Sequence, residues 1–155
     1  MNEIYKSANR KIPKLLERLL EKAPISGEDL YKREIPRSGV YVFFENRKAI
    51  YVGRSNRMKE RLREHSSVSA DHYSATLAFK IAKQEYLSEN PELKRPRNKE
   101  LMAKSDFLRK FKAAKERISK SKIRFIKLKD QIEQSLFEIY THLELKTKYN
   151  DFRTH

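Results

Sequence analysis

Two short runs of apolar, β-branched and aromatic residues constrain the fold of this chain more than any other feature. They span residues 39–44 and 49–52, and four polar residues separate them. Short runs of this composition on either side of a polar connection are typical of a β-hairpin. The fold must therefore include antiparallel strands.

Apolar residues at helical spacing predict helices on both sides of this hairpin. We expect helices over residues 9–22, 58–65, 72–87, 99–120 and 131–145. Ser55 or Asn56 is expected to cap the second of these. Alternating apolar and basic residues predict a third strand over 122–129, whereas 25–34 is expected to be polar or helical. This order predicts a small α+β fold on an antiparallel sheet.

Charge is concentrated in one part of the chain. The formal net charge is +15, and residues 94–129 hold fifteen Lys or Arg against three acids, which gives them +12 of that total. Such a one-sided segment favours a phosphate-binding surface over a salt-bridged surface helix, so nucleic acid is the expected partner. The absence of cysteine excludes disulfides, zinc ribbons and thiol catalysis. With no signal peptide or apolar run of membrane length, we expect a soluble cytoplasmic protein without a membrane partner.

Four side chains in and after the hairpin are of the types that can assist the cleavage of a phosphodiester bond. Tyr41 and Tyr51 lie at comparable ends of the two strands, and Arg61 and His65 share one face of the following helix. Arginine stabilises the charge of a phosphoryl transition state, and Tyr and His can carry protons. A metal ligand is missing from this local set.

These residues form a longer pattern. Residues 39–41 read Gly-Val-Tyr and 51–53 read Tyr-Val-Gly; Arg61 and His65 follow, then Glu138 and, twelve residues later, Asn150. The set resembles the GIY-YIG nuclease superfamily over about residues 38–150. The resemblance implies a three-stranded antiparallel sheet flanked by helices. It also implies hydrolysis of nucleic-acid phosphodiester bonds that depends on Mg²⁺ or Mn²⁺.

The resemblance also implies a role for each residue of the pattern. Tyr41 would be the general base or would position the attacking water, and Arg61 would bind the scissile phosphate. Tyr51 and His65 would assist by hydrogen bonding. A free tyrosine titrates at about pH 10, so Arg54, Arg61 or the metal would have to lower the pKa of Tyr41, or His65 would have to accept its proton.

Glu138 would be the only protein ligand of the metal, and Asn150 would organise the site or a nearby loop. Glu133, one turn earlier, is the rival ligand. The twelve-residue distance from Glu138 to Asn150 favours Glu138.

We expect two parts in this chain: an N-terminal helical extension over residues 1–36 and a nuclease-like domain over residues 37–155. Within that domain, a basic helical insertion is expected at about 90–120. The extension and the insertion are additions to the part that resembles the family. The cations expected to bind nucleic acid are Arg54, Arg57, Arg109, Lys110, Lys112, Lys115 and Arg117.

Three functions remain open at this point. The first is a DNA endonuclease, alone, as a homodimer or with a partner protein. The second is a non-catalytic nucleic-acid-binding module that kept the fold. The third is an RNA-directed nuclease, because nothing in the sequence separates RNA from DNA.

Overall fold

The predicted hairpin is present in the computed structural model, which describes residues 1–152; the predicted domain end at residue 155 lies outside them. Strands β2 (Gly39–Glu45) and β3 (Lys48–Ser55) pair in antiparallel fashion. Asn46 and Arg47 join them with φ values of 47° and 65°. Two consecutive positive φ values are typical of the tight type I′ turn, so the connection is shorter than the four residues expected.

The sheet has four strands in the order β1-β4-β2-β3, all antiparallel, rather than the three predicted. The third predicted strand is present as β4 (Lys122–Lys127). The additional strand, β1 (Ile25–Ser26), pairs with β4 and leads into the 3-10 helix η1 (Gly27–Lys32). A two-residue strand has no periodicity of its own, so only its pairing partner reveals it. The α+β class with an antiparallel sheet is confirmed.

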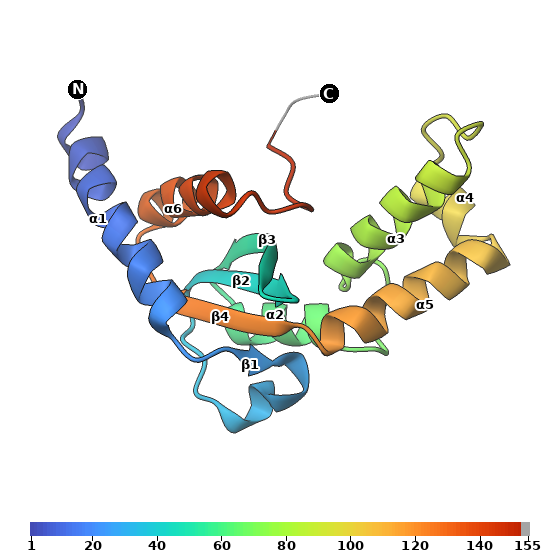
Figure 1. The fold of residues 1–155 in the computed structure, drawn as a ribbon, viewed down its shortest axis with the longest axis horizontal. Coiled ribbons are helices and arrows are strands. Elements are labelled where there is room, and N and C mark those ends of the chain that lie inside the picture. The colour runs from blue at the N-terminus through green and yellow to red at the C-terminus, as the bar shows by residue number, and fades with distance from the viewer. Residues whose placement is uncertain (153–155) are drawn as a thin grey trace.

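Helices cover both faces of the sheet (Figure 1). Val40, Val42 and Phe44 point to the face that α1 (Glu3–Glu21) and α6 (Gln131–Leu145) cover. The alternate residues of β2 point to the opposite face, into the cluster that includes residues of α2 (Met58–Ser66), α3 (Thr76–Glu89) and α5 (Ser105–Ser119). Residues 39–44 are therefore buried throughout, as expected for a central strand with both faces covered.

Helix α1 begins six residues before the predicted start. The side chain of Asn2 accepts hydrogen bonds from the backbone of Ile4 at 2.9 Å and of Tyr5 at 3.3 Å, which caps the first turn. Pro13 lies inside the helix without ending it. Packing of the apolar face on the sheet offsets the hydrogen bond that proline cannot donate.

Helices α3 (Thr76–Glu89), α4 (Asn98–Met102) and α5 (Ser105–Ser119) extend away from the sheet on the side opposite α1 (Figure 1). The single helix predicted over 99–120 is wrong, because the chain is extended at Lys104. Leu101 and Phe107 are both fully buried. Six residues apart on one continuous helix they would face different directions, and the break lets both reach the core.

The start of α2 also differs from the prediction. Arg57, not Ser55 or Asn56, precedes the helix, and the backbone N–H of Met58 donates to the carbonyl of Arg37 at 2.9 Å. The hydroxyl of Ser55 instead accepts from the backbone of Arg57 at 2.9 Å. Within residues 1–152, no helix combines the length and apolarity needed to cross a bilayer.

Candidate active site

The two tyrosines of the pattern share the face of the sheet that α2 covers. Tyr41 lies opposite Gly53, and Phe43 lies opposite Tyr51, so Tyr41 and Tyr51 are diagonal neighbours across the hairpin. Their ring centres are 6.4 Å apart. Tyr41 is fully buried and Tyr51 is partly exposed. The predicted convergence of the two phenols is therefore present.

His65 meets Tyr41 from helix α2. Its Nε2 atom lies 3.1 Å from the hydroxyl of Tyr41, and its ring is fully buried between the two tyrosines and Phe43. Nδ1 of His65 has no hydrogen-bond partner among the described residues. Among residues 1–152, Tyr41 is thus the one hydrogen-bond partner of this imidazole.

Gly53 provides the room that the Tyr41 ring needs. A Cβ atom at this position would lie 2.5 Å from both the hydroxyl oxygen and the adjoining ring carbon of Tyr41. No side chain fits at that separation unless the ring moves. Contact with the Tyr41 ring therefore explains why the Tyr-Val-Gly motif ends in a glycine.

Arg61 lies one helical turn before His65 and is held at three points. Its guanidinium donates to Glu64 at 2.9 Å, to the carbonyl of Ser74 at 3.2 Å and to the hydroxyl of Thr76 at 2.5 Å. Its charge influences the pKa values of Tyr41 and His65, so it belongs to the same cluster. These contacts fix the guanidinium close to the tyrosines.

Glu138 reaches the site from α6. Its side chain is 17% exposed, and Oε2 accepts a hydrogen bond from Nε of Arg54 at 3.1 Å. Its charge influences the pKa values of both Tyr41 and Tyr51. The rival carboxylate, Glu133, instead forms an ion pair with Lys11 of α1 at 2.8 Å. The geometry therefore favours Glu138 over Glu133.

Burial dominates the protonation of the Tyr41–His65 pair. It raises the pKa of Tyr41, and the nearby Tyr51 adds to this rise, whereas Arg61 opposes it. Burial, followed by the charge of Arg61, lowers the pKa of His65 to about 3. At neutral pH the phenol is therefore protonated and the imidazole is neutral. Arg61 does not bring the pKa of Tyr41 below its usual range, and the low pKa of His65 likewise opposes proton transfer to its imidazole.

The carboxylate of Glu138 is suited to a hard divalent cation. Burial raises its pKa, and Arg54 offsets this only in part. Among residues 1–152 no three His, Cys, Asp or Glu side chains gather to enclose a metal. Mg²⁺ does not require such a cage, because it retains several waters and often binds one or two carboxylates together with substrate phosphates.

Asn150 lies at the free edge of β3 rather than among the tyrosines. Its Oδ1 accepts from the backbone N–H of Val52, and its Nδ2 donates to the carbonyl of Val52, both at 2.8 Å. The hydroxyl of Thr147 donates to the same Oδ1 at 2.7 Å, and the N–H of Tyr149 donates to Ile50 at 2.9 Å. Asn150 thus holds the strand that carries Tyr51, which agrees with an organising role.

The cations expected to bind nucleic acid fall into two groups. Arg54 and Arg57 lie beside the site, where Arg54 pairs with Glu138 and Arg57 with Glu64. The other five lie on α5. Of these, Arg109 and Lys112 are exposed.

The three remaining cations of α5 have partners inside the molecule. Lys110 pairs with Glu89 at 2.8 Å, and Lys115 donates to the carbonyl of Ala70 at 3.0 Å. Arg117 donates two hydrogen bonds to Glu45 and one to Glu85. These contacts join α5 to the hairpin, to α3 and to the loop after α2.

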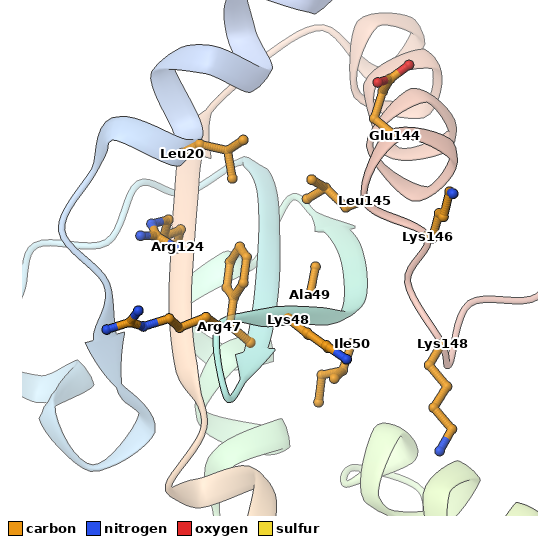
Figure 2. Close-up of a pocket in the computed structure, with 11 residues that line it drawn as sticks. Leu20, Arg47, Lys48, Ala49, Ile50, Arg124, Glu144, Leu145, Lys146 and Lys148 are labelled. Carbon is orange, nitrogen blue, oxygen red and sulfur yellow. The ribbon is translucent and has the colours of Figure 1, made fainter.

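The pocket in Figure 2 lies on the other face of the sheet. It has a volume of about 660 Å³ and lies between the ends of α1 and α6, over Phe44 and Arg124. Arg124 is paired with Val42, which places it on the face opposite Tyr41. Figure 2 shows that Arg47 and Arg124 extend away from Lys146 and Lys148, so the cations do not converge on one point. The pocket is separate from the tyrosine cluster.

The motif does not include the residues that hold Arg61, and only one of these, Glu64, could have been found from the sequence. Glu64 lies three residues after Arg61, a spacing that pairs side chains on a helix. Ser74 and Thr76 have no such signal, because a loop brings them to Arg61.

No protein-family model, curated protein or solved structure matches this chain.

Proposed function

We propose that this chain is a divalent-metal-dependent endonuclease of the GIY-YIG type, which hydrolyses phosphodiester bonds of DNA. The observation that carries the proposal is the gathering of Tyr41, Tyr51, Arg61 and His65 at one place, with Glu138 close enough to influence both tyrosines. Glu138 comes from a helix 97 positions after Tyr41. A purely structural strand pair needs none of these polar partners.

Tyr41 would act together with His65. As the phenol oxygen takes a proton from the attacking water, its own proton passes to Nε2 of His65, 3.1 Å away. The low pKa of His65 opposes this transfer, and Arg61 is its second cause. A phosphate bound to Arg61 would offset that charge and make the imidazole a better acceptor.

Arg61 would bind the scissile phosphate. Its contacts with Glu64, Ser74 and Thr76 hold it in place before substrate arrives. A preorganised guanidinium stabilises charge that develops on the phosphoryl oxygens without having to reorient.

Glu138 would hold Mg²⁺ or Mn²⁺. When bound, the metal would supply charge stabilisation at the phosphate and lower the pKa of water. Arg54 would have to release Glu138, and substrate phosphate is the natural new partner for its guanidinium.

The test is cleavage of supercoiled plasmid, branched DNA and RNA in Mg²⁺, Mn²⁺ or EDTA, with wild type, Glu138→Gln and Glu133→Gln. We expect metal-dependent nicking of DNA that Glu138→Gln abolishes. Glu133→Gln is the matched control, because it makes the same change on the same helix and should retain activity. Loss of cleavage in Glu133→Gln alone would contradict the ligand assignment.

The ion pair between Arg54 and Glu138 favours one alternative, a module that binds nucleic acid without cutting it, because the ligand carboxylate is already occupied. Binding without cleavage under every metal would support that function. Cleavage of RNA but not DNA would support the RNA-directed nuclease.

A further inference from the structure

Tyr73 is an exposed aromatic side chain on a fixed support. It is 79% exposed, and its ring centre lies 4.0 Å from that of His72 at an interplanar angle of 35°. The centre of the His72 ring lies 5.6 Å from that of Phe79, a residue of α3 that is buried in the core. The three rings thus form a row of contacts from the core to the surface, and the outermost ring, that of Tyr73, is mostly exposed to solvent.

The loop that carries Tyr73 is held at several points. Oδ1 of Asp71 accepts from the backbone N–H of Tyr73 at 3.1 Å and of Ser74 at 2.9 Å. Lys115 of α5 donates to the carbonyl of Ala70. The loop is therefore anchored to the basic helix as well as internally.

The same loop contacts the candidate site directly. Arg61 donates to the carbonyl of Ser74, the residue that follows Tyr73. Consecutive Cα atoms are about 3.8 Å apart, so Tyr73 is anchored beside the side chain that would bind the phosphate. A nucleic acid strand that runs from α5 to Arg61 would cross this loop.

We propose that Tyr73 is a stacking platform for an unpaired base next to the phosphate that Arg61 binds. A base inside a duplex is already stacked on both sides, so a protein ring receives a base only where the strand is single or distorted. The substrate class is then nucleic acid with unpaired bases at the cut, such as a flap or a junction. This inference rests on the proposed function and narrows it.

The test measures binding in EDTA by fluorescence anisotropy, so that no cleavage interferes. The probes are a single strand, a flapped duplex and a fully paired duplex of one sequence, and the proteins are wild type, Tyr73→Ala, Tyr73→Trp and Tyr31→Ala. Tyr31 is the matched control, because it is 72% exposed and lies on η1, beside Arg63 and Ser66 of α2 rather than among the residues that hold Arg61. Tyr73 lies at the surface, so its replacement leaves the core intact.

Tyr73→Ala should weaken binding to the single strand and the flap by roughly 5- to 150-fold, and binding to the paired duplex by about twofold or less. Tyr73→Trp should retain wild-type affinity, and Tyr31→Ala should leave all three affinities unchanged. Equal loss on all three probes, or no loss on any, would overturn the platform while metal-dependent cleavage by wild type still stood. Selective loss without cleavage in any metal would keep the platform and overturn the nuclease. No binding of wild type to any probe would overturn both.

Discussion

At the scale of single residues, Tyr41 and His65 share a hydrogen bond in a place that water barely reaches. Burial works in opposite directions on the two groups, because the charged form is a phenolate in one and an imidazolium in the other. Both groups are thus held neutral. Transfer of a proton from Tyr41 to His65 therefore requires a nearby negative charge, such as a phosphate, to stabilise the imidazolium.

The low pKa of His65 makes the stability of the fold depend on pH. Below about pH 6.5 the unfolded chain binds a proton at His65, and the folded chain does not bind it until about pH 3. The free energy of unfolding should therefore fall as the pH falls through this window, by at most about 1.4 kcal/mol per pH unit from this group. Urea unfolding of wild type and His65→Gln between pH 6.5 and 4 measures the difference in slope.

Tyr41→Phe tests whether burial or the hydrogen bond to Tyr41 causes the dependence of unfolding free energy on pH. It removes the hydrogen bond but keeps the ring that buries His65, and burial is the first cause of the low pKa. The variant should therefore retain most of the wild-type slope. A wild-type slope equal to that of His65→Gln would contradict a buried neutral histidine.

Gly53→Ala should disturb the site by steric overlap. The new methyl group would meet the Tyr41 ring, so the ring has to shift from His65, and we expect a loss of about 1–3 kcal/mol in unfolding free energy. Denaturant unfolding measures this loss. In the background of Tyr41→Ala the same glycine substitution should cost much less, because the obstacle is gone. Equal costs in both backgrounds would show that the contact does not matter.

At the scale of elements, α5 has one side that serves the fold and one that faces solvent. Phe107, Phe111 and Ile118 are buried against the core. Arg109 and Lys112 lie on the exposed side, while Lys110, Lys115 and Arg117 are bound to neighbouring elements. The affinity of this helix for phosphates should therefore depend most on Arg109 and Lys112.

The double variant Arg109→Gln with Lys112→Gln should bind all DNA sequences more weakly. The slope of log affinity against log salt should become smaller by about 1.8, since each phosphate contact to duplex DNA contributes about 0.9. The unfolding free energy should not change. Filter binding across a salt series is the measurement, and Lys146→Gln with Lys148→Gln is a control with the same loss of charge elsewhere on the molecule. An unchanged salt slope in the α5 variant would exclude this face as a contact.

Arg117 is expected to behave differently although it lies on the same helix. Its replacement by Met leaves Glu45, which is 19% exposed, without its partner. Because Arg117 itself is partly exposed, we expect a modest loss of about 1–2 kcal/mol in unfolding free energy. Lys110→Met, which breaks a more exposed ion pair, should cost less in the same urea titration. The reverse order would contradict a structural role for Arg117.

At the scale of the whole molecule, residues 1–36 are part of the packed sheet. Helix α1 covers Val40, Val42 and Phe44, and β1 adds a strand beside β4. Expressed alone, residues 37–155 should expose this apolar face and aggregate or bind a hydrophobic dye, whereas the full chain should do neither. Dye fluorescence and light scattering measure this outcome. A well-folded 37–155 fragment would show that the N-terminal segment is dispensable.

Local patterns predicted much of the fold. The hairpin, α2 and α6 each have a periodicity that needs no distant partner, and all three are present. The break at Lys104 and the short strand β1 were missed because both depend on contacts made far along the chain. Neither feature has a local sequence signal strong enough to override the pattern around it.

The candidate site was predictable to a similar extent. Tyr41, Tyr51, Arg61 and His65 lie where the hairpin and one helix face place them. The pairing of Arg54 with Glu138 joins residues 84 positions apart, and that of Arg117 with Glu45 joins residues 72 positions apart. Pairings of this kind follow from packing and not from spacing.

The distance along the chain between β3 and the segment that covers its edge has a consequence during synthesis. Val52 finds its partner in Asn150, 98 residues later. A ribosome that adds about 5–20 residues per second needs about 5–20 s to make that stretch. Throughout that interval the nascent hairpin presents an unpaired strand edge, the kind of surface that associates with other chains. Glu138 is made late in the same interval, so the side chain that would bind the metal joins the two tyrosines only shortly before this edge is covered.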